Sequence, residues 1–411
     1  MFTRNLLAPL LLALSITANP VQVNKSPVTV SISRRVNLTS VHNLVRHDQA
    51  RARVLKAKGA AMAAGLSFQN TAIINEPVNN QATTYIAKID IGNPPTSYFL
   101  IVDTGSSNTW IGAGTSYNKT TTSTETTNSV TVSYGSGSFA GTEFTDQVAI
   151  TPGLVIPNQS IGVASRSNGF IGLDGILGIG PVDLTRGTLS PATDTQIPTV
   201  TDNLFAKGVI SNNKIGVYFE PSNTTESENG EITWGGTDST KFTGSITYIP
   251  LTRASPANEY WGINQSVRYG TTAILSTTAG IVDTGTTLIL LATDGFKKYQ
   301  SATGGVDDQV TGLLRVTPAQ FKNLKSLFFT SGGATFELTA NAQIWPRALN
   351  TDIGGTGGNI YLIVASLGST SGEGLDFING FAFLERFYSV LDTENKRVGF
   401  ATTHYTYATF N

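Results

Sequence analysis

Residues 101–107 read Ile-Val-Asp-Thr-Gly-Ser-Ser, and residues 281–287 repeat the same pattern as Ile-Val-Asp-Thr-Gly-Thr-Thr. Five positions are identical, and the other two exchange serine for threonine. A single Asp-Thr-Gly in a chain rich in threonine and glycine usually marks a turn. Two seven-residue copies, each at the end of an apolar strand, instead indicate a duplicated unit built around an aspartate.

The duplication extends beyond these seven residues. An apolar segment ending in glycine follows each copy, at 176–178 (Ile-Leu-Gly) and at 377–380 (Phe-Ile-Asn-Gly). The second segment has Asn379 at a position where an apolar residue is expected, which leaves the local packing there open. The sequence therefore predicts two similar lobes, each made from about half of the body of the chain.

The repeated unit is suited to hold a carboxylate in one orientation. Glycine allows the backbone to approach closely, and the serine and threonine hydroxyls can donate hydrogen bonds to carboxylate oxygens. If two such aspartates face each other at ~3 Å, their repulsion is about 5–6 kcal/mol at an effective dielectric constant of ~20, or roughly four pK units. They would then share one proton over a wide acid range and provide an acid and a base side by side.

The composition excludes several other kinds of chemistry. The chain has 411 residues, which suits two domains, and only 13% of them are charged, which argues against a disordered chain or a basic nucleic-acid binder. Cysteine is absent, so disulfides, thiolate nucleophiles and Cys-ligated metals are excluded. Histidine occurs three times, which disfavours Ser-His-Asp catalysis and multi-histidine metal sites. Carboxylates are therefore the expected acid–base groups.

The amino terminus has the features of a secretory signal. Residues 1–18 combine Arg4, a short apolar run from Leu6 to Leu14, and small residues ending at Ala18. The run is too short to span a bilayer, and we expect a secreted protein rather than a membrane protein. Sequons for N-glycosylation, which fit this route, start at Asn37, Asn118, Asn158, Asn223 and Asn264.

The segment that follows the signal differs in charge from the rest. Residues 19–62 carry eight lysines and arginines and one acid, Asp48, whereas residues 63–411 hold 18 Lys and Arg against 27 Asp and Glu. We interpret residues 19–70 as a prosegment held on the acidic body by charge, with an end between 60 and 80 and a helix over 41–58. Lys56 and Lys58 are its two candidates for blocking the active site. A basic arm for nucleic acid or anionic lipid fits a secretory signal less well.

The body, from Thr83 onward, is predicted to be mostly β. Short segments rich in Val, Ile, Tyr, Phe and Thr alternate with turn residues, and residues 115–128 indicate a solvated loop. The expected strands are 85–91, 98–102, 129–133, 214–219, 246–250 and 387–391, and the expected helices are 201–208, 293–302 and 317–327.

These motifs resemble those of the pepsin-like aspartic proteases, particularly the polyporopepsin-type enzymes of basidiomycete fungi. The resemblance covers essentially the whole chain after the signal. It is carried by the two active-site motifs at 103–110 and 283–286, the flap hairpin at 132–138 (Val-Ser-Tyr-Gly-Ser-Gly-Ser), the segment 174–178 (Asp-Gly-Ile-Leu-Gly), and the C-terminal strands at 381–400.

The resemblance implies a bilobal, mainly β acid-protease fold with a central cleft and a few short helices. The N-terminal lobe with its flap would span 80–219, and the C-terminal lobe 220–411. Asp103 and Asp283 would be the catalytic pair. The residues implied to support the pair are Thr104, Gly105, Ser106, Thr284, Gly285 and Thr286, and those implied to contact substrate are Tyr134, Gly135, Ser136, Trp110, Ile101, Leu173 and Ile176. Trp110 would be the hydrogen-bond partner of Tyr134.

The resemblance also implies an activity: a secreted endopeptidase made as a zymogen, acting on proteins and peptides at acidic pH through a water activated by the aspartates. We expect a monomer without metal or organic cofactor. Some fungal relatives have aspartate where this flap has Ser136, so we predict a preference for large apolar residues on both sides of the scissile bond. The alternatives are a non-catalytic binding protein of the same fold, a carboxylate-pair glycosidase, and a metal site, for which Asp-Thr-Gly offers few ligands.

Overall fold

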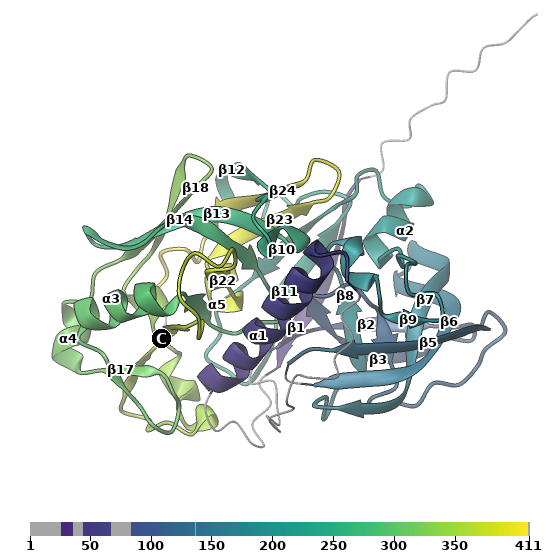
Figure 1. Ribbon diagram of the computed structural model, residues 1–411, viewed down its shortest axis with the longest axis horizontal. Coiled ribbons are helices and arrows are strands. Elements are labelled where there is room, and N and C mark those ends of the chain that lie inside the picture. The colour runs from purple at the N-terminus through teal and green to yellow at the C-terminus, as the bar shows by residue number, and fades with distance from the viewer. Residues whose placement is uncertain (1–25, 36–43, 67–83, 136, 410–411) are drawn as a thin grey trace, which may run out of the picture.

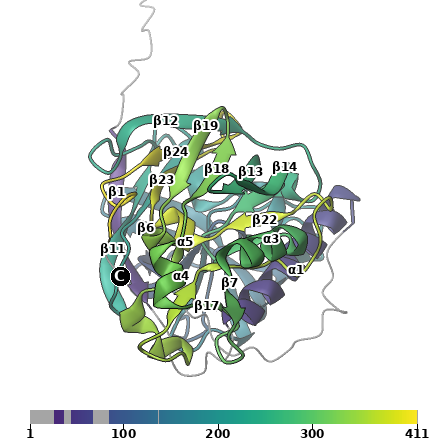
Figure 2. The same ribbon diagram turned by 90° about the vertical axis from the view of Figure 1, so that its left-hand side faces the viewer.

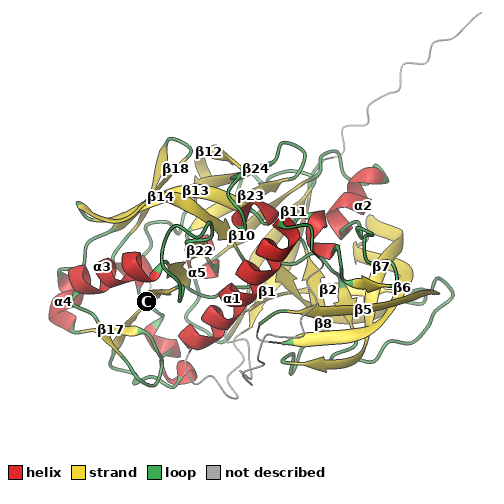
Figure 3. Ribbon diagram, viewed as in Figure 1, coloured by secondary structure: helices red, strands yellow, loops and turns green. Residues whose placement is uncertain are grey.

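The computed structural model describes residues 26–35, 44–66, 84–135 and 137–409. The predicted signal peptide, the sequon at Asn37 and the flap residue Ser136 lie outside these described residues. Strands dominate, and the helices are few and mostly short, as Figure 3 shows. The predicted mainly β, two-lobed fold is confirmed.

The first lobe is a set of antiparallel hairpins on the right of Figure 1. Its longest hairpin, β6–β7, alternates buried and less buried residues as a half-covered sheet requires. The predicted loop at 115–128 is partly strand, because residues from Thr124 pair with β6. The strands of this lobe are β2 (Thr84–Ile91), β3 (Thr96–Asp103), β4 (Trp110–Ile111), β5 (Thr124–Ser133), β6 (Ser138–Thr151), β7 (Leu154–Asn168), β8 (Gly175–Gly178) and β9 (Leu189–Ser190).

A set of strands from distant parts of the chain joins the two lobes. Hydrogen bonds run without interruption through the order β12-β24-β23-β10-β11-β1-β2-β3-β8-β4-β7-β6-β5-β9. The joining strands are β1 (Val28–Arg35), β10 (Lys214–Phe219), β11 (Glu226–Trp234), β12 (Thr243–Pro250), β23 (Phe387–Asp392) and β24 (Arg397–Thr402). The lobe boundary expected at 219–220 stays a prediction.

The second lobe, on the left of Figure 1, has a seven-stranded and a three-stranded sheet. Figure 2 faces this lobe and shows helices α3 and α4 on its near side. The seven-stranded sheet contains β13 (Gly262–Tyr269), β14 (Thr272–Val282), β15 (Ile289–Leu291), β18 (Leu327–Ser331), β19 (Ala334–Leu338), β21 (Val364–Ser366) and β22 (Phe377–Asn379). The smaller sheet contains β16 (Val306–Asp307), β17 (Leu314–Val316) and β20 (Ile360–Leu362).

The predicted duplication is visible in the strand register. In the first lobe β3 runs parallel to β8, with Val102 beside Leu177. In the second lobe β14 runs parallel to β22, with Val282 beside Asn379. Val102, Leu177 and Val282 belong to a hydrophobic core that runs through the two lobes, and Asn379 is buried beside it. The equivalent pairings bring Asp103 and Asp283 to the same point at the end of their strands.

The helices have recognisable end signals. Thr199 and Thr317 each form a capping box with the residue three positions later, and Gly304, at φ 69°, ends α3. The helix expected over 317–327 ends at Lys322, because the residues from Leu327 pair with β13 and β19. The helices are α1 (Leu44–Ala63), α2 (Val200–Ala206), α3 (Thr293–Thr303), α4 (Pro318–Lys322) and α5 (Phe381–Leu384), with short 3₁₀ turns at Val182–Thr185, Ala257–Glu259, Asn341–Gln343, Arg347–Leu349 and Thr351–Ile353.

Two elements come from the basic segment that precedes the body. Strand β1 lies between β11 and β2, with Val30 opposite Ile232 and Arg34 opposite Tyr85. Helix α1 crosses the molecule between the two lobes (Figure 1). It continues to Ala63, beyond the predicted end at residue 58, because alanine-rich residues 60–63 favour helix. Within the described ranges, no helix is long and apolar enough to cross a membrane.

Candidate active site

The two Asp-Thr-Gly loops meet where the lobes join and brace each other through their threonines. The Thr104 backbone N–H donates to Thr284 Oγ1 at 3.0 Å, and the Thr284 N–H donates to Thr104 Oγ1 at 2.9 Å. Each hydroxyl also donates to a carbonyl of the opposite lobe, Thr104 to Val282 at 3.3 Å and Thr284 to Val102 at 2.8 Å. This reciprocal pattern fixes the two loops relative to each other.

Each aspartate is held by its own loop in the same way. The hydroxyl three residues later donates to the outer carboxylate oxygen at 2.5 Å, from Ser106 to Asp103 and from Thr286 to Asp283. The N–H two residues later donates to the inner oxygen, at 2.9 Å and 3.2 Å respectively. Both carboxylates are buried. Their orientation is therefore set by local hydrogen bonds in each lobe.

Glycine at 105 and 285 is required by the close approach of the lobes. A Cβ atom on Gly105 would lie 2.6 Å from Oδ1 of Asp283, and one on Gly285 would lie 2.7 Å from Oδ1 of Asp103. Real Cβ atoms do not approach other atoms so closely, so any larger residue would push the opposite aspartate away.

Arg51 of α1 contacts both aspartates. Its Nη2 donates to Asp103 Oδ1 at 2.6 Å and to Asp283 Oδ1 at 2.8 Å, and its Nε donates to Asp283 Oδ2 at 2.7 Å. One nitrogen thus bridges two carboxylates that face each other across the lobe boundary. Burial alone would raise the pKa of Asp283, but the charge and hydrogen bonds of Arg51, together with the hydrogen bonds from Thr286 and the Gly285 N–H, outweigh it and lower that pKa. Burial likewise works against the charged form of Arg51, and the two carboxylates reverse the effect and raise the pKa of Arg51.

The two lysines singled out in the sequence bind elsewhere. Lys56 pairs with Glu373 at 2.5 Å and donates to Ser369 at 2.9 Å. Lys58 is buried and donates to the carbonyl of Leu184 at 2.8 Å, and burial lowers its pKa to about 8. Sequence reasoning therefore missed Arg51. It lies seven residues before Lys58, about two helical turns away on the same face, so the helical period places both residues toward the body without separating them.

Further contacts fix α1 in this position. The carboxylate of Asp48 accepts a hydrogen bond from the Leu288 N–H at 2.8 Å, just after the second aspartate loop. The Tyr260 hydroxyl donates to the Leu55 carbonyl at 2.7 Å. The flap also lies against the helix, since a Cβ atom on Gly135 would be 2.7 Å from the Ala50 carbonyl oxygen. Helix α1 therefore contacts both the flap and the second lobe.

Five of the seven expected substrate-contact residues form one buried cluster in the first lobe. Ile101, Leu173 and Ile176 pack there with Tyr134 and Trp110. The other members of the cluster are Ile86, Val130, Val132, Phe139, Phe170, Leu189 and Ile197. The Tyr134 and Trp110 rings stack with their centroids 6.4 Å apart. The Tyr134 hydroxyl and Trp110 Nε1 are buried, and neither forms a hydrogen bond of normal geometry with any described residue. The hydrogen bond expected between them stays a prediction.

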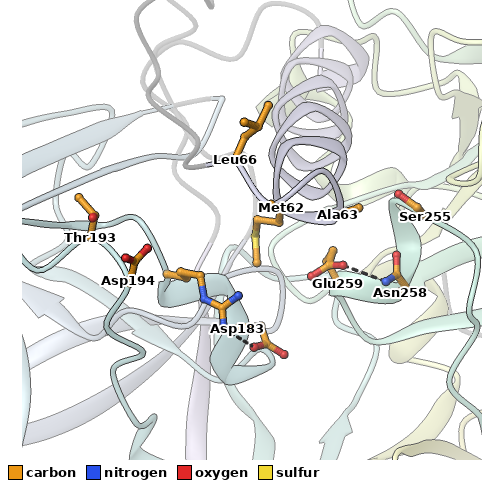
Figure 4. A pocket seen from close by; sticks show the side chains of 11 residues that line it. Met62, Ala63, Leu66, Asp183, Thr193, Asp194, Ser255, Asn258 and Glu259 are labelled. Atoms are coloured by element: carbon orange, nitrogen blue, oxygen red, sulfur yellow. Dashed lines mark hydrogen bonds and ion pairs between the residues drawn. The ribbon is translucent and has the colours of Figure 1, made fainter.

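A pocket of about 780 Å³ opens where α1 ends (Figure 4). Its walls come from the end of the helix at Met62 and Leu66, from the first-lobe residues Asp183 and Asp194, and from Glu259 of the second lobe. Burial, with the nearby charge of Asp183, raises the pKa of Glu259. Three carboxylates and one cation, Arg186, thus line a pocket between the lobes beside the end of α1.

The sequon asparagines in the described residues are all exposed on the body: Asn118, Asn158, Asn223 and Asn264. Asn264 lies in β13, and its side-chain oxygen accepts a hydrogen bond from Thr252 at 2.9 Å. Attachment of a glycan at these positions stays a prediction.

Residues 84–403 match the family described as "Eukaryotic aspartyl protease". The chain is 65% identical to polyporopepsin from Irpex lacteus over 336 residues, which cover 82% of this chain and 98% of that protein. It is 31% identical to human gastricsin, over 82% of this chain and 85% of that protein. Among solved structures, the crystal structure of an aspartic proteinase from Irpex lacteus matches with a TM-score of 0.79 at 66% identity, covering 80% of this chain and 96% of the other.

Proposed function

As a member of the eukaryotic aspartyl protease family, this chain is an aspartic endopeptidase, and we propose that it cleaves peptide bonds at acidic pH with Asp103 and Asp283 as its catalytic pair. The observation that carries this proposal is the bridging contact of Arg51. One guanidinium nitrogen lies within hydrogen-bond distance of both carboxylates, so the space between them can also hold one small polar group such as a water. No cofactor is part of the proposed mechanism.

The mechanism follows from two facing carboxylates that share one proton. The ionised aspartate takes a proton from water as the water oxygen bonds to the scissile carbonyl carbon. The carbonyl oxygen, which receives the electron pair of the C=O bond, takes the proton held by the other aspartate. The tetrahedral intermediate then collapses: one of its two hydroxyls gives its proton to the aspartate that has just become ionised, and the C=O bond re-forms there. The C–N bond breaks, the leaving nitrogen accepts the proton of the other aspartate, and the pair again holds one proton. Acidic pH is needed because one of the two carboxyls must be protonated.

We infer that the chain is made as a zymogen and that β1 and α1 belong to its inhibitory prosegment. Arg51 would block the catalytic pair. Basic residues of these elements pair with acids of the body at three further places: Arg34 with Glu385, Arg35 with Glu226, and Lys56 with Glu373. The family match begins at residue 84, and the match to polyporopepsin leaves about a fifth of this chain unmatched. Both facts are consistent with removal of the leading segment. The mature amino terminus stays open between 60 and 80.

The apolar side-chain preference rests on the cluster beneath the flap. Ile101, Leu173 and Ile176 supply buried aliphatic surface there. A panel of peptides that differ only at the two positions flanking the scissile bond tests this preference. Faster cleavage at Phe or Leu than at Lys supports it, and fastest cleavage after Lys contradicts it.

Secretion is the remaining part of the proposal and rests on the signal-like residues 1–18 and the exposed sequons. Expression with and without residues 2–18 tests it, because only the full chain should reach the medium. Removal of N-glycans with a glycosidase should then lower the apparent mass if the sequons are used. A monomer is expected, which size-exclusion chromatography with light scattering can check.

The catalytic proposal is tested with Asp103→Asn and Asp283→Asn, with Asp307→Asn as the control because Asp307 is exposed and lies on β16. Each protein is purified at neutral pH and acidified, and hydrolysis of a peptide is followed with and without pepstatin alongside N-terminal sequencing. We expect turnover in wild type and control, inhibition by pepstatin, and no turnover in either dyad variant. An active dyad variant would overturn the mechanism. Tight peptide binding without turnover by the wild type would favour the binding-protein alternative.

A further inference from the structure

A pair of buried amide side chains lies behind the second aspartate loop. Gln265 of β13 and Asn379 of β22 bond to each other in both directions. The Asn379 amide N–H donates to Gln265 Oε1 at 3.0 Å, and the Gln265 N–H donates to Asn379 Oδ1 at 3.3 Å. Gln265 is 1% exposed and Asn379 is fully buried. Because buried amides require partners, loss of either side chain leaves the other unsatisfied.

The strand register shows that the first lobe has apolar residues in the corresponding places. Gln265 lies opposite Thr278, five residues before Asp283, and Ile89 lies opposite Tyr98, five residues before Asp103. By the same comparison Asn379, beside Val282, corresponds to Leu177, beside Val102. Ile89 and Leu177 are both fully buried in the core. An apolar pair is therefore compatible with this fold, and the amide pair is a feature of the second lobe.

The segment that begins at Asn379 carries the second aspartate loop. The Asn379 carbonyl accepts the backbone N–H of Asp283 at 3.2 Å. Two residues further along the same segment donate to the loop: the Phe381 N–H to the Thr286 carbonyl at 2.9 Å, and the Ala382 N–H to the Thr287 carbonyl at 3.1 Å. Three main-chain hydrogen bonds thus tie residues 379–382 to residues 283–287. A shift of Asn379 would be transmitted directly to Asp283.

We propose that the Gln265–Asn379 pair positions Asp283. The side-chain bonds anchor residue 379 to β13, and residue 379 in turn holds the N–H of Asp283, so the pair sets where that carboxylate stands relative to Asp103. Gln265 and Asn379 touch no reacting atom in this account. They are positioning residues, and their loss should lower kcat while KM for a peptide changes little. This inference rests on the proposed function, because it assumes that Asp283 is catalytic.

The decisive variant restores the apolar pattern of the first lobe. Gln265→Leu combined with Asn379→Leu removes both amides, so no buried polar group is left without a partner. The single substitutions serve as comparisons, and Gln343→Leu is the matched control. Gln343 is a fully buried glutamine of the same lobe whose side chain accepts from Tyr299 at 2.9 Å and donates to the carbonyls of Lys325 and Leu338 at 2.9 and 3.1 Å. All proteins are the full chain, activated by acid.

Each variant is measured for the midpoint of thermal unfolding, for kcat and KM with one peptide, and for the pH profile of kcat/KM. The double variant should unfold near the wild-type temperature. Its kcat should nevertheless be about 10- to 100-fold lower than that of the wild type, and its KM should be within about twofold of the wild-type value. Its pH profile should shift by about half a unit, because the distance between the carboxylates sets how strongly they share a proton. The Gln343→Leu control should lose thermal stability and keep the wild-type kcat and pH profile.

Two results would overturn the proposal. If the double variant folds and equals the wild type in kcat and pH profile, the pair contributes stability alone. If the double variant does not fold, the pair is likewise required for folding rather than for positioning. A wild-type protein that shows no turnover after acid activation would instead refute the proposed function itself, so the two failures can be distinguished.

Discussion

Replacing Arg51 by alanine should release the block on the aspartate pair and make activation occur at higher pH. The side chain makes three charge-assisted hydrogen bonds to two buried carboxylates. Removing one partner of a buried ion pair costs about 3–5 kcal/mol. The freed carboxylates can take up one shared proton, which recovers part of that cost, so we use the lower value. A loss of about 3 kcal/mol raises the ratio of open to closed molecules by roughly 100-fold.

The direction of the pH effect follows from the pKa of Asp283, which Arg51 lowers against the opposing effect of burial. A carboxyl whose pKa is lower in the closed state stabilises that state at any pH above its open-state pKa. The contribution is lost as the pH falls through the lowered value. The wild-type zymogen should therefore open only on acidification, and Arg51→Ala should shift the midpoint of activation upward.

The assay mixes purified zymogen into buffers between pH 3 and 7 and records the initial rate of cleavage of a fluorogenic peptide. Loss of the prosegment is followed on gels in the same samples. The matched control is Arg53→Ala, which removes an exposed arginine from the same helix. If Arg51→Ala and Arg53→Ala activate at the same rate at every pH, within about twofold, the account of Arg51 as the blocking group is wrong.

Three further changes test other parts of the structure. Arg34→Gln removes a cation beside buried Glu385, whose pKa is raised by burial. A raised carboxyl pKa means that stability is lost as the pH rises, so the midpoint of thermal unfolding of this zymogen should fall more at pH 7 than at pH 4. An equal fall at both pH values would contradict the assignment. Gly105→Ala places a methyl group 2.6 Å from Asp283 Oδ1 and should lower kcat of the activated enzyme by at least about 100-fold, whereas Gly357→Ala, at a site with open space and ordinary backbone geometry, should leave kcat unchanged. Thr104→Val leaves the Thr284 N–H and the Val282 carbonyl without their hydrogen-bond partner, and it should destabilise the protein by about 2–4 kcal/mol in denaturant unfolding. Thr104→Ser keeps the hydroxyl and should stay close to wild type. Equal stability of the two variants would argue against the reciprocal threonine contacts between the lobes.

The features that were predictable from the sequence are those that depend on local residue patterns. The repeat around Asp103 and Asp283 indicated two related lobes, and β-branched and aromatic runs located strands such as 214–219, which the structure has as Lys214–Phe219. The helix predicted over 317–327 is longer than the observed one, because local propensity does not reveal that Leu327–Ser331 pairs with two other strands. Tertiary pairing overrides propensity at that point.

The residue that contacts the aspartates could not be chosen from composition. Arg51, Arg53, Lys56 and Lys58 are all basic and lie within eight residues of one another. Only the docking of α1 decides that Arg51 faces the pair, Lys58 meets a backbone carbonyl and Arg53 faces solvent. Similarly, the sequence marked Asn379 as unusual, but its partner Gln265 lies 114 residues away and is brought to it by the sheet.

The central claim is that Asp103 and Asp283 share one proton where the lobes meet. Neutron diffraction from crystals of the activated enzyme grown near pH 4 would test it most directly. The account predicts one hydrogen between the facing carboxylates, with a single water bound to both. Two fully protonated carboxyls, two bare ones, or carboxylates that no longer face each other once α1 has left would contradict it.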